Sequence, residues 1–279
     1  MNKTLYITDL DGTLLNSKPR VSEYSLNKIN SLIEKGMNFT IATARSHESA
    51  APLIAELDLR LPIILHNGVF VYDPLKQKYI HENFIRTETV QEIIRILSTI
   101  EINPIIFTKS NKNFYTYYKG FQNPGGKKYI KSRLSKNDKR FRLVSNFDKA
   151  LSEKIITLII IDRKNKLEEI HEKIKDEFDL NFLISEDVYS VDSYWLEITT
   201  KNSTKKDAIL FLKKHLKAEK TICFGDNTND ISMFEIADES YAVENAVQEL
   251  KDIATDVIDS NKEDGVARFL EMHYNEELK

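Results

Sequence analysis

Two aspartates, Asp9 and Asp11, follow a short apolar run that begins at Leu5, and Gly12 comes directly after them. The apolar run predicts a buried strand, and the glycine predicts a tight turn. Ligands of open α/β sheets bind just beyond the carboxyl ends of the strands, so this spacing places two acids where a substrate would sit. Two neighbouring acids repel each other unless a hard cation such as Mg²⁺ holds them. One carboxylate can then attack phosphorus, while the other transfers protons.

A second acidic cluster lies near the other end of the chain, where an apolar run ends at Phe224 and residues 225–230 follow it. Its polar members include Asp226, Asn229 and Asp230. Helix capping explains one polar residue here, but not two acids and an asparagine that repeat the pattern at Asp9. Thr43 at a third strand end and Lys205 at a helix start add a hydroxyl and an ammonium group. Together these groups suit a phosphoryl group held by Mg²⁺, a lysine and hydrogen-bond donors.

Taken alone, the spacing at Asp9 also has the less specific interpretation of a polar turn or part of a calcium loop. An EF-hand loop needs glycine at position six and glutamate at position twelve, whereas Gly12 falls at position four of a loop that begins at Asp9. The calcium-loop interpretation therefore fails. A polar turn remains the alternative to catalysis for this motif by itself.

The elements around these motifs predict an α/β fold with an insertion. Apolar strands alternate with helices from Leu5 to Leu65, including a helix that Ser22 caps and Gly36 ends, and the alternation returns after Thr204. Such alternation implies a parallel sheet covered on both faces. The middle region lacks this rhythm and is expected to form a separate α+β unit. Its expected strands are 105–108, 114–118, 155–161, 182–184 and 195–199, and its expected helices are 87–100, 127–134 and 164–178.

Bulk composition excludes several classes of protein. A hydrophobic content of 41% with 30% charged residues is typical of a globular protein. The longest aliphatic run, Ile155 to Ile161, is too short to cross a bilayer, and the first residues lack the apolar core of a signal peptide. A single cysteine, Cys223, excludes an internal disulfide, fits a reducing compartment and is expected to be inert core. We therefore expect a cytoplasmic protein without a membrane partner.

Six short motifs follow one another along the chain: 8–15, 42–46, Asn67-Gly68, Thr204-Lys205, 225–230 and 261–267. In these motifs and their order the chain resembles haloacid dehalogenase (HAD) superfamily phosphohydrolases of the Cof type, which carry a large C2-type cap. The first and fifth motifs are highly specific together. The resemblance implies a Rossmann-like parallel-sheet core of residues 1–81 and 198–279. It also implies an inserted α+β cap of residues 82–197 that acts as a lid.

The resemblance also implies the catalytic and metal-binding roles. Asp9 would be the nucleophile and a Mg²⁺ ligand, and Asp11 would be the general acid and base with its backbone carbonyl on the metal. Lys205 would neutralise charge on the nucleophile and phosphate. Asp226 would bind Mg²⁺, and Asp230 would orient a metal-bound water. Family ATPases tend to carry threonine in place of Asp11, so the acid implies hydrolysis or mutase chemistry instead of ion pumping.

The same resemblance implies a phosphate-binding set made of Thr43, Ala44, Arg45 and Asn229. Alanine stands at position 44 where the family usually has glycine, which would make a positive φ costly there. Arg45 is also open to interpretation as a structural ion-pair partner. Lys206 occupies a position where the family usually has glycine, and the spacing of Lys205 from Ala208 favours Lys205 as the phosphate-side lysine.

The leading hypothesis is a Mg²⁺-dependent phosphatase of a small phosphorylated metabolite, such as a sugar phosphate, FMN or pyridoxal phosphate. A phosphomutase of the phosphomannomutase type is an alternative. A nucleic-acid or regulatory binding module is another, because the aromatic run 114–118 lies in a stretch, Lys109 to Arg142, with eleven Lys and Arg and one acid. The intact acidic set argues against this module, since a pure binding protein does not need it. The basic stretch is also expected to steer anionic substrates, with a solvated charged face as the alternative.

Overall fold

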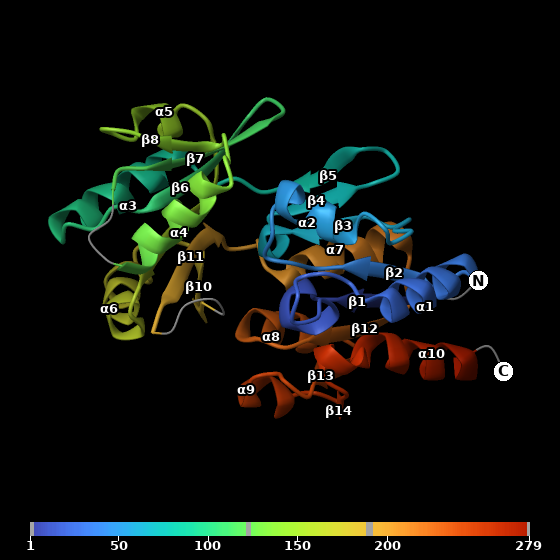
Figure 1. The fold of residues 1–279 in the computed structure, drawn as a ribbon. Helices are drawn as coiled ribbons and strands as arrows, with labels where there is room; N and C mark the ends of the chain where they lie inside the picture. The colour runs from blue at the N-terminus through green and yellow to red at the C-terminus, as the bar shows by residue number, and fades with distance from the viewer. Residues whose placement is uncertain (1–2, 121–123, 188–191, 278–279) are drawn as a thin grey trace. The chain divides into compact units, whose positions relative to one another are not determined.

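The computed structural model describes residues 3–120, 124–187 and 192–277 and divides into two compact units (Figure 1). The first unit combines Met1–Glu82 with Ser203–Lys279, and the second is Asn83–Asn202, an insertion into the first. The second unit therefore ends at 202 instead of the expected 197, because β11 (Tyr194–Thr200) stays paired with the inserted sheet up to its last residue. Residues 1–2 and 278–279 of the expected core, and 121–123 and 188–191 of the expected cap, lie outside the described residues.

A parallel sheet of five strands forms the centre of the first unit, in the order β14-β13-β12-β1-β2. Its strands are β1 (Thr4–Thr8), β2 (Asn38–Ile41), β12 (Lys220–Gly225), β13 (Glu239–Val243) and β14 (Asp256–Ile258). All five residues of β1 are buried, because this strand lies between β12 and β2. The expected parallel sheet is confirmed, and β1 and β12 are neighbours within it.

A smaller antiparallel sheet continues from the edge next to β2, with strands β3 (Ile63–Leu65), β4 (Phe70–Asp73) and β5 (Lys78–Glu82). Ala42 pairs with Ile64 in parallel, which joins the end of β2 to β3. Strands β4 and β5 pair antiparallel and form a hairpin. Asp73 stabilises its turn by accepting the Lys76 backbone N–H at 2.9 Å.

The described residues of the first unit also form six α-helices: α1 (Glu23–Glu34), α2 (His47–Ile54), α7 (Lys205–Leu216), α8 (Ile231–Phe234), α9 (Gln248–Lys251) and α10 (Gly265–Glu277). The Ser22 side chain accepts the Ser25 backbone N–H at the start of α1, as its sequence predicts. Gly36, with φ at +97°, follows the end of this helix. Helices α1 and α10 pack against each other, as do α7 and α8.

The second unit contains a six-stranded sheet in the order β10-β11-β9-β6-β7-β8. Besides β11, its strands are β6 (Ile105–Ser110), β7 (Asn113–Tyr118), β8 (Phe141–Leu143), β9 (Lys154–Asp162) and β10 (Leu180–Glu186). Its helices are α3 (Thr87–Thr99), α4 (Pro124–Ser135), α5 (Asp148–Leu151) and α6 (Lys164–Ile174). Successive strand residues point to opposite faces of this sheet and belong to two apolar clusters. Ile106 packs in the cluster that includes α3, α5 and α6, and Ile105 packs in the cluster that includes α4.

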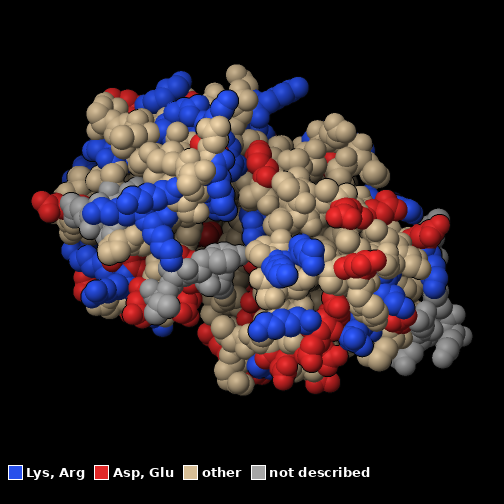
Figure 2. Space-filling model, in the orientation of Figure 1, with Lys and Arg blue, Asp and Glu red and all other residues tan. Residues whose placement is uncertain are grey.

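The basic stretch Lys109 to Arg142 runs from the end of β6 through β7 and α4 into β8. Lys127, Lys128 and Lys131 of α4 are exposed, and Figure 2 shows Lys and Arg side chains gathered over the second unit on the face that is drawn. Among the helices of the described ranges, none has the length and apolar character needed to cross a bilayer.

Candidate active site

The candidate site begins where two neighbouring parallel strands end. Asp9 directly follows β1, and Asp226 directly follows β12. Thr8 pairs with Phe224 in the sheet, and the Asp9 backbone N–H donates to the Phe224 carbonyl at 2.9 Å. The two acids therefore leave the same edge of the sheet side by side, as the sequence predicts.

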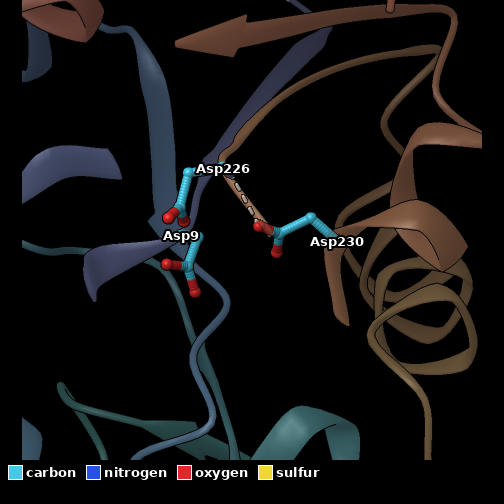
Figure 3. Close-up of side chains that lie close together, drawn as sticks. All are labelled: Asp9, Asp226 and Asp230. Atoms are coloured by element: carbon cyan, nitrogen blue, oxygen red, sulfur yellow. Dashed lines mark hydrogen bonds between the residues drawn. The ribbon is translucent and has the colours of Figure 1, made fainter. Parts of the chain in front are cut away.

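Three buried carboxylates meet at this edge (Figure 3). One oxygen each of Asp9, Asp226 and Asp230 lies within 4.8 Å of the others. Asp230 directly precedes α8, and its Oδ2 accepts the backbone N–H groups of Asp226 at 2.9 Å and Asn227 at 3.1 Å. These bonds fix the Asp230 side chain toward the end of β12 and hold the cluster together.

Lys205, the first residue of α7, supplies a positive charge to the cluster. Its Nζ donates to Asp9 Oδ1 and to Asp230 Oδ1, both at 2.6 Å, and its side chain is fully buried. The side chain of Lys206 is 41% exposed and lies 3.6 Å from Glu235. Lys205 is therefore the lysine that faces the acids, as its spacing favoured.

Burial strongly shifts the protonation of these groups. It raises the pKa of Asp9 to about 7, and the negative charges of Asp230 and Asp11 add to this effect while the Lys205 ammonium opposes it. Burial and the charge of Asp9 raise the pKa of Asp226 well above its ordinary value. The two carboxylates raise the pKa of Lys205, although its burial acts in the opposite direction. Three ionised acids facing one ammonium group would leave an excess of negative charge, which a cation that displaces their protons would neutralise.

The donor set fits a hard divalent cation, because the cluster offers carboxylate oxygens and excess negative charge. Thr13 supports this geometry, since its Oγ1 donates to Asp226 Oδ1 at 2.9 Å and orients that carboxylate. The carboxylate of Asp11 is not a member of the cluster. Its expected contribution to a metal is the backbone carbonyl, which stays a prediction.

Gly12 allows the turn after Asp9 to approach Asp226 closely. Its φ is +82°, and a Cβ at this position would lie 2.2 Å from Asp226 Oδ2. Any other residue would be strained by this backbone conformation and would also displace the Asp226 carboxylate. The glycine of the first motif is therefore required by the acid cluster itself.

Arg45 makes a bidentate ion pair with Asp11. Its Nε donates to Asp11 Oδ2 at 2.6 Å, and its Nη2 donates to Asp11 Oδ1 at 2.5 Å. This contact agrees with the interpretation of Arg45 as an ion-pair partner. Phosphate binding by Arg45 stays a prediction.

Thr43, Ala44 and Asn229 complete the expected phosphate-binding set. Thr43 is buried beyond β2 and accepts the Arg45 backbone N–H at 3.1 Å, and a hydroxyl that accepts one bond can still donate its own proton. Ala44 is exposed and does not have a positive φ, so the expected strain from alanine is absent. Asn229 Nδ2 donates to Asn67 Oδ1 at 3.2 Å, and its contact with phosphate stays a prediction.

Several residues at the site had no expected role. Thr13 and Asn67 belong to two of the six motifs, so the sequence indicated that they lie near the site but did not indicate which residues they contact. Asn245, which donates to the Gly12 carbonyl at 2.8 Å, lies outside every motif. Cys223 lies in β12, and burial raises the pKa of its thiol, as expected of inert core.

Comparison with known protein families shows to which family this chain belongs. Residues 6–270 match the model of the haloacid dehalogenase-like hydrolase family. The chain belongs to this family. The matched range contains all six motifs, and the family resemblance inferred from those motifs is confirmed.

Similar HAD-like proteins include enzymes named as phosphatases. The 5-amino-6-(5-phospho-D-ribitylamino)uracil phosphatase YitU of Bacillus subtilis is 23% identical over 274 residues, which is 97% of each chain. The phosphatase YwpJ of the same organism is 27% identical, over 95% of this chain and 98% of its own. The crystal structure of TM0651 from Thermotoga maritima has a TM-score of 0.78 at 27% identity and covers 98% and 97% of the two chains. The protein whose site is described above is therefore a hydrolase that acts on phosphate esters.

Proposed function

We propose that this HAD-like hydrolase is a Mg²⁺-dependent phosphatase that cleaves a small phosphorylated metabolite through an aspartyl-phosphate on Asp9. One observation supports this most strongly: Asp9 directly follows the buried strand β1, binds Lys205 and is grouped with Asp226 and Asp230. A buried carboxylate held by an ammonium group beside two further acids is poor packing material, but it suits a nucleophile at a phosphoryl site.

Asp9, Asp226 and the Asp11 carbonyl would hold Mg²⁺, with Asp230 acting through a water. The ion supplies charge neutralisation, which permits a carboxylate to approach an anionic phosphate. Thr13 orients Asp226, and backbone N–H groups orient Asp230, so the chain prepares its oxygen ligands without the substrate.

In the first step an oxygen of Asp9 attacks phosphorus, and the bond from phosphorus to the ester oxygen breaks. Asp11 in its acid form donates a proton to the departing oxygen, so the product leaves as an alcohol. Lys205 keeps Asp9 oriented and balances charge as the phosphoryl group arrives. Thr43, the backbone N–H of Ala44 and Asn229 would bind the phosphoryl oxygens, while Arg45 would orient Asp11 through their ion pair.

In the second step Asp11, now a carboxylate, accepts a proton from water while the water oxygen attacks phosphorus. The bond between phosphorus and the Asp9 oxygen breaks, which releases inorganic phosphate and restores both carboxyl groups. Asp11 thus donates one proton and recovers one in each cycle, as an acid–base residue requires.

The substrate is proposed to be a sugar phosphate or a phosphorylated cofactor such as FMN or pyridoxal phosphate. YitU is named for a substrate that carries a phosphorylated ribityl chain, which supports small phosphomonoesters as the class to test. The second unit, as the cap of this enzyme, would set specificity. A cytoplasmic location belongs to the same proposal, supported by the single buried cysteine.

The test is release of inorganic phosphate from a panel of sugar phosphates, nucleotides and phosphorylated cofactors, with and without Mg²⁺. We expect hydrolysis of at least one small phosphomonoester, dependent on Mg²⁺ and absent in Asp9→Asn. Phosphate transfer within the substrate without net release would indicate the mutase alternative. No turnover of any phosphomonoester at any Mg²⁺ concentration would contradict the proposal.

A further inference from the structure

The turn that carries Asp11 and Gly12 is held from outside by two asparagine side chains. Residues Leu10–Leu14 form this turn, which the Leu15 N–H closes by donating to the Leu10 carbonyl at 2.8 Å. Asn245 Nδ2 donates to the Gly12 carbonyl at 2.8 Å. Asn261 Nδ2 donates to the Leu15 carbonyl, also at 2.8 Å.

These two asparagines also contact each other. Asn245 Oδ1 accepts the Asn261 backbone N–H at 3.0 Å, so the two amides form one chain of hydrogen bonds from Gly12 to Leu15. The Asn245 amide uses both its donor and its acceptor, which fixes its orientation. The turn is therefore held by hydrogen bonds at its middle, at Gly12, and just beyond its end, at Leu15.

The loop that carries Asn245 also binds the backbone at Asp226, a member of the acid cluster. Two residues further on, the Val247 backbone N–H donates to the Asp226 carbonyl at 2.9 Å. One short loop thus binds the backbone of the turn at Gly12 and the backbone at Asp226. These two segments are in close approach, because a Cβ on Gly12 would lie 2.2 Å from Asp226 Oδ2.

We propose that Asn245 and Asn261 are positioning residues that set the orientation of the catalytic turn relative to Asp226. They act through hydrogen bonds to the carbonyls of Gly12 and Leu15, and not through hydrogen bonds to the acids. The inference gives a role to the 261–267 motif, which no catalytic step uses. The effect that we expect on kcat rests on the proposed function, whereas the effect that we expect on the conformation of the turn does not.

Two variants of Asn245 separate positioning from simple packing. Asn245→Ala removes the whole amide. Asn245→Asp keeps the size and the acceptor for the Asn261 N–H, but it cannot donate to the Gly12 carbonyl and places negative charge beside it. Because Asn245 is exposed, neither variant removes core packing. If the hydrogen bond to Gly12 is what matters, Asp should be as damaging as Ala.

Asn30→Ala is the matched control. Asn30 makes the same two kinds of bond elsewhere in the first unit, donating to the Glu56 carbonyl at 2.9 Å and accepting the Asp58 N–H at 2.8 Å. Asn30→Ala removes the same two kinds of hydrogen bond, and neither Asn30 nor its partners Glu56 and Asp58 belong to any of the six motifs. A purely structural role for Asn245 predicts that the two alanine variants behave alike.

The kinetic measurement is kcat and KM for a phosphomonoester that the wild type hydrolyses. We expect kcat to fall roughly 10–100-fold in both Asn245 variants, as for residues that orient metal ligands, with KM nearly unchanged and Asn30→Ala like the wild type. The structural measurement is amide hydrogen exchange without substrate. The Leu15 N–H should exchange faster in the Asn245 variants and at the wild-type rate in Asn30→Ala.

The outcomes distinguish this inference from the proposed function. Wild-type kcat and unchanged Leu15 exchange in both Asn245 variants would overturn the positioning role while leaving the phosphatase proposal intact. A wild type that hydrolyses no phosphomonoester would overturn the proposed function. In that case faster Leu15 exchange in the Asn245 variants alone would still support the positioning role, and unchanged exchange would overturn it.

Discussion

Arg45 binds both carboxylate oxygens of Asp11, through its Nε at 2.6 Å and its Nη2 at 2.5 Å. Asp11 is the proposed acid and base, yet in this arrangement each of its oxygens already accepts a charge-assisted hydrogen bond. The pair is only partly exposed, so the contact restrains the side chain more than a surface ion pair would. For a proton to pass through Asp11, at least one of these two bonds has to be exchanged for a bond to substrate or water.

Removal of the bidentate contact should affect turnover more than binding. We expect Arg45→Ala and Arg45→Lys both to lower kcat about tenfold or more, because a charge-assisted hydrogen bond contributes ~1.5–3 kcal/mol and lysine cannot reproduce the fork. KM should change little. Steady-state kinetics on one phosphomonoester checks this. A large rise in KM with unchanged kcat in Arg45→Ala, rescued by lysine, would show that Arg45 acts on the substrate phosphate instead.

Lys205 and its neighbour Lys206 provide a matched pair of variants that tests the charge balance of the site. Lys205→Met leaves three buried carboxylates without their ammonium partner, so we expect turnover to be lost. We also expect the free energy of unfolding in metal-free buffer to fall by ~3–5 kcal/mol, as when one member of a buried ion pair is removed. Lys206→Met should stay within about 0.5 kcal/mol of the wild type with normal kcat. Chemical denaturation and kinetics test both, and similar behaviour of the two variants would contradict this charge balance.

Binding of Mg²⁺ should release protons and strengthen as pH rises. Burial raises the pKa of Asp9 from 3.8 to about 7, so the metal-free native state binds more protons than the unfolded state between these values. The contribution of Asp9 to stability therefore falls as pH rises through this window. A cation that displaces those protons offsets the loss.

Calorimetric titration with Mg²⁺ at pH 6 and pH 8, in buffers of different ionisation enthalpy, measures both effects. We expect tighter binding at pH 8, proton release at pH 6, and a larger rise of Tm with Mg²⁺ at the higher pH. Asp9→Asn should lose the proton release linked to this residue. Equal affinity at both pH values without proton release would show that the metal does not compete with these protons.

Gly12→Ala tests the close approach of the turn to Asp226, with Gly36→Ala as the control. Both glycines have positive φ, +82° and +97°, so alanine costs ~1–2 kcal/mol of stability at either position. A Cβ at Gly36 meets its nearest neighbour only at 3.9 Å, whereas one at Gly12 would lie 2.2 Å from Asp226 Oδ2. We expect Gly12→Ala alone to abolish phosphatase activity and weaken Mg²⁺ binding, as measured by kinetics and calorimetry. Equal activity of the two variants would contradict the close approach.

The strand ends of the site could be predicted from the sequence because local patterns specify them. Thr4–Thr8 is a buried strand inside the sheet, and its apolar run ends at the acids whether or not the rest of the fold is known. Lys205 begins α7, as its expected place at a helix start predicted, and Thr204 caps the helix by accepting the Asp207 N–H. Short elements such as β8 and α5 were missed, since three or four residues carry little periodicity.

The contacts between loops could not be predicted in the same way. The bond from Asn245 to Gly12 joins residues 233 positions apart and depends on how two loops meet at the sheet edge. The partner of Arg45 was left open for the same reason, because an arginine near an acidic motif can reach either a phosphate or a carboxylate. Only the three-dimensional arrangement decided that it reaches Asp11.

Covalent catalysis by Asp9 is most directly tested by trapping the phosphorylated enzyme. The protein is mixed with a substrate that carries a radiolabelled phosphoryl group, quenched in acid within the first turnover, and digested for peptide mapping. We expect label on the peptide that contains Asp9, removable by hydroxylamine as an acyl phosphate is, and no label or turnover in Asp9→Asn. Label on a different residue, or turnover at the wild-type rate by Asp9→Asn, would contradict the proposed mechanism.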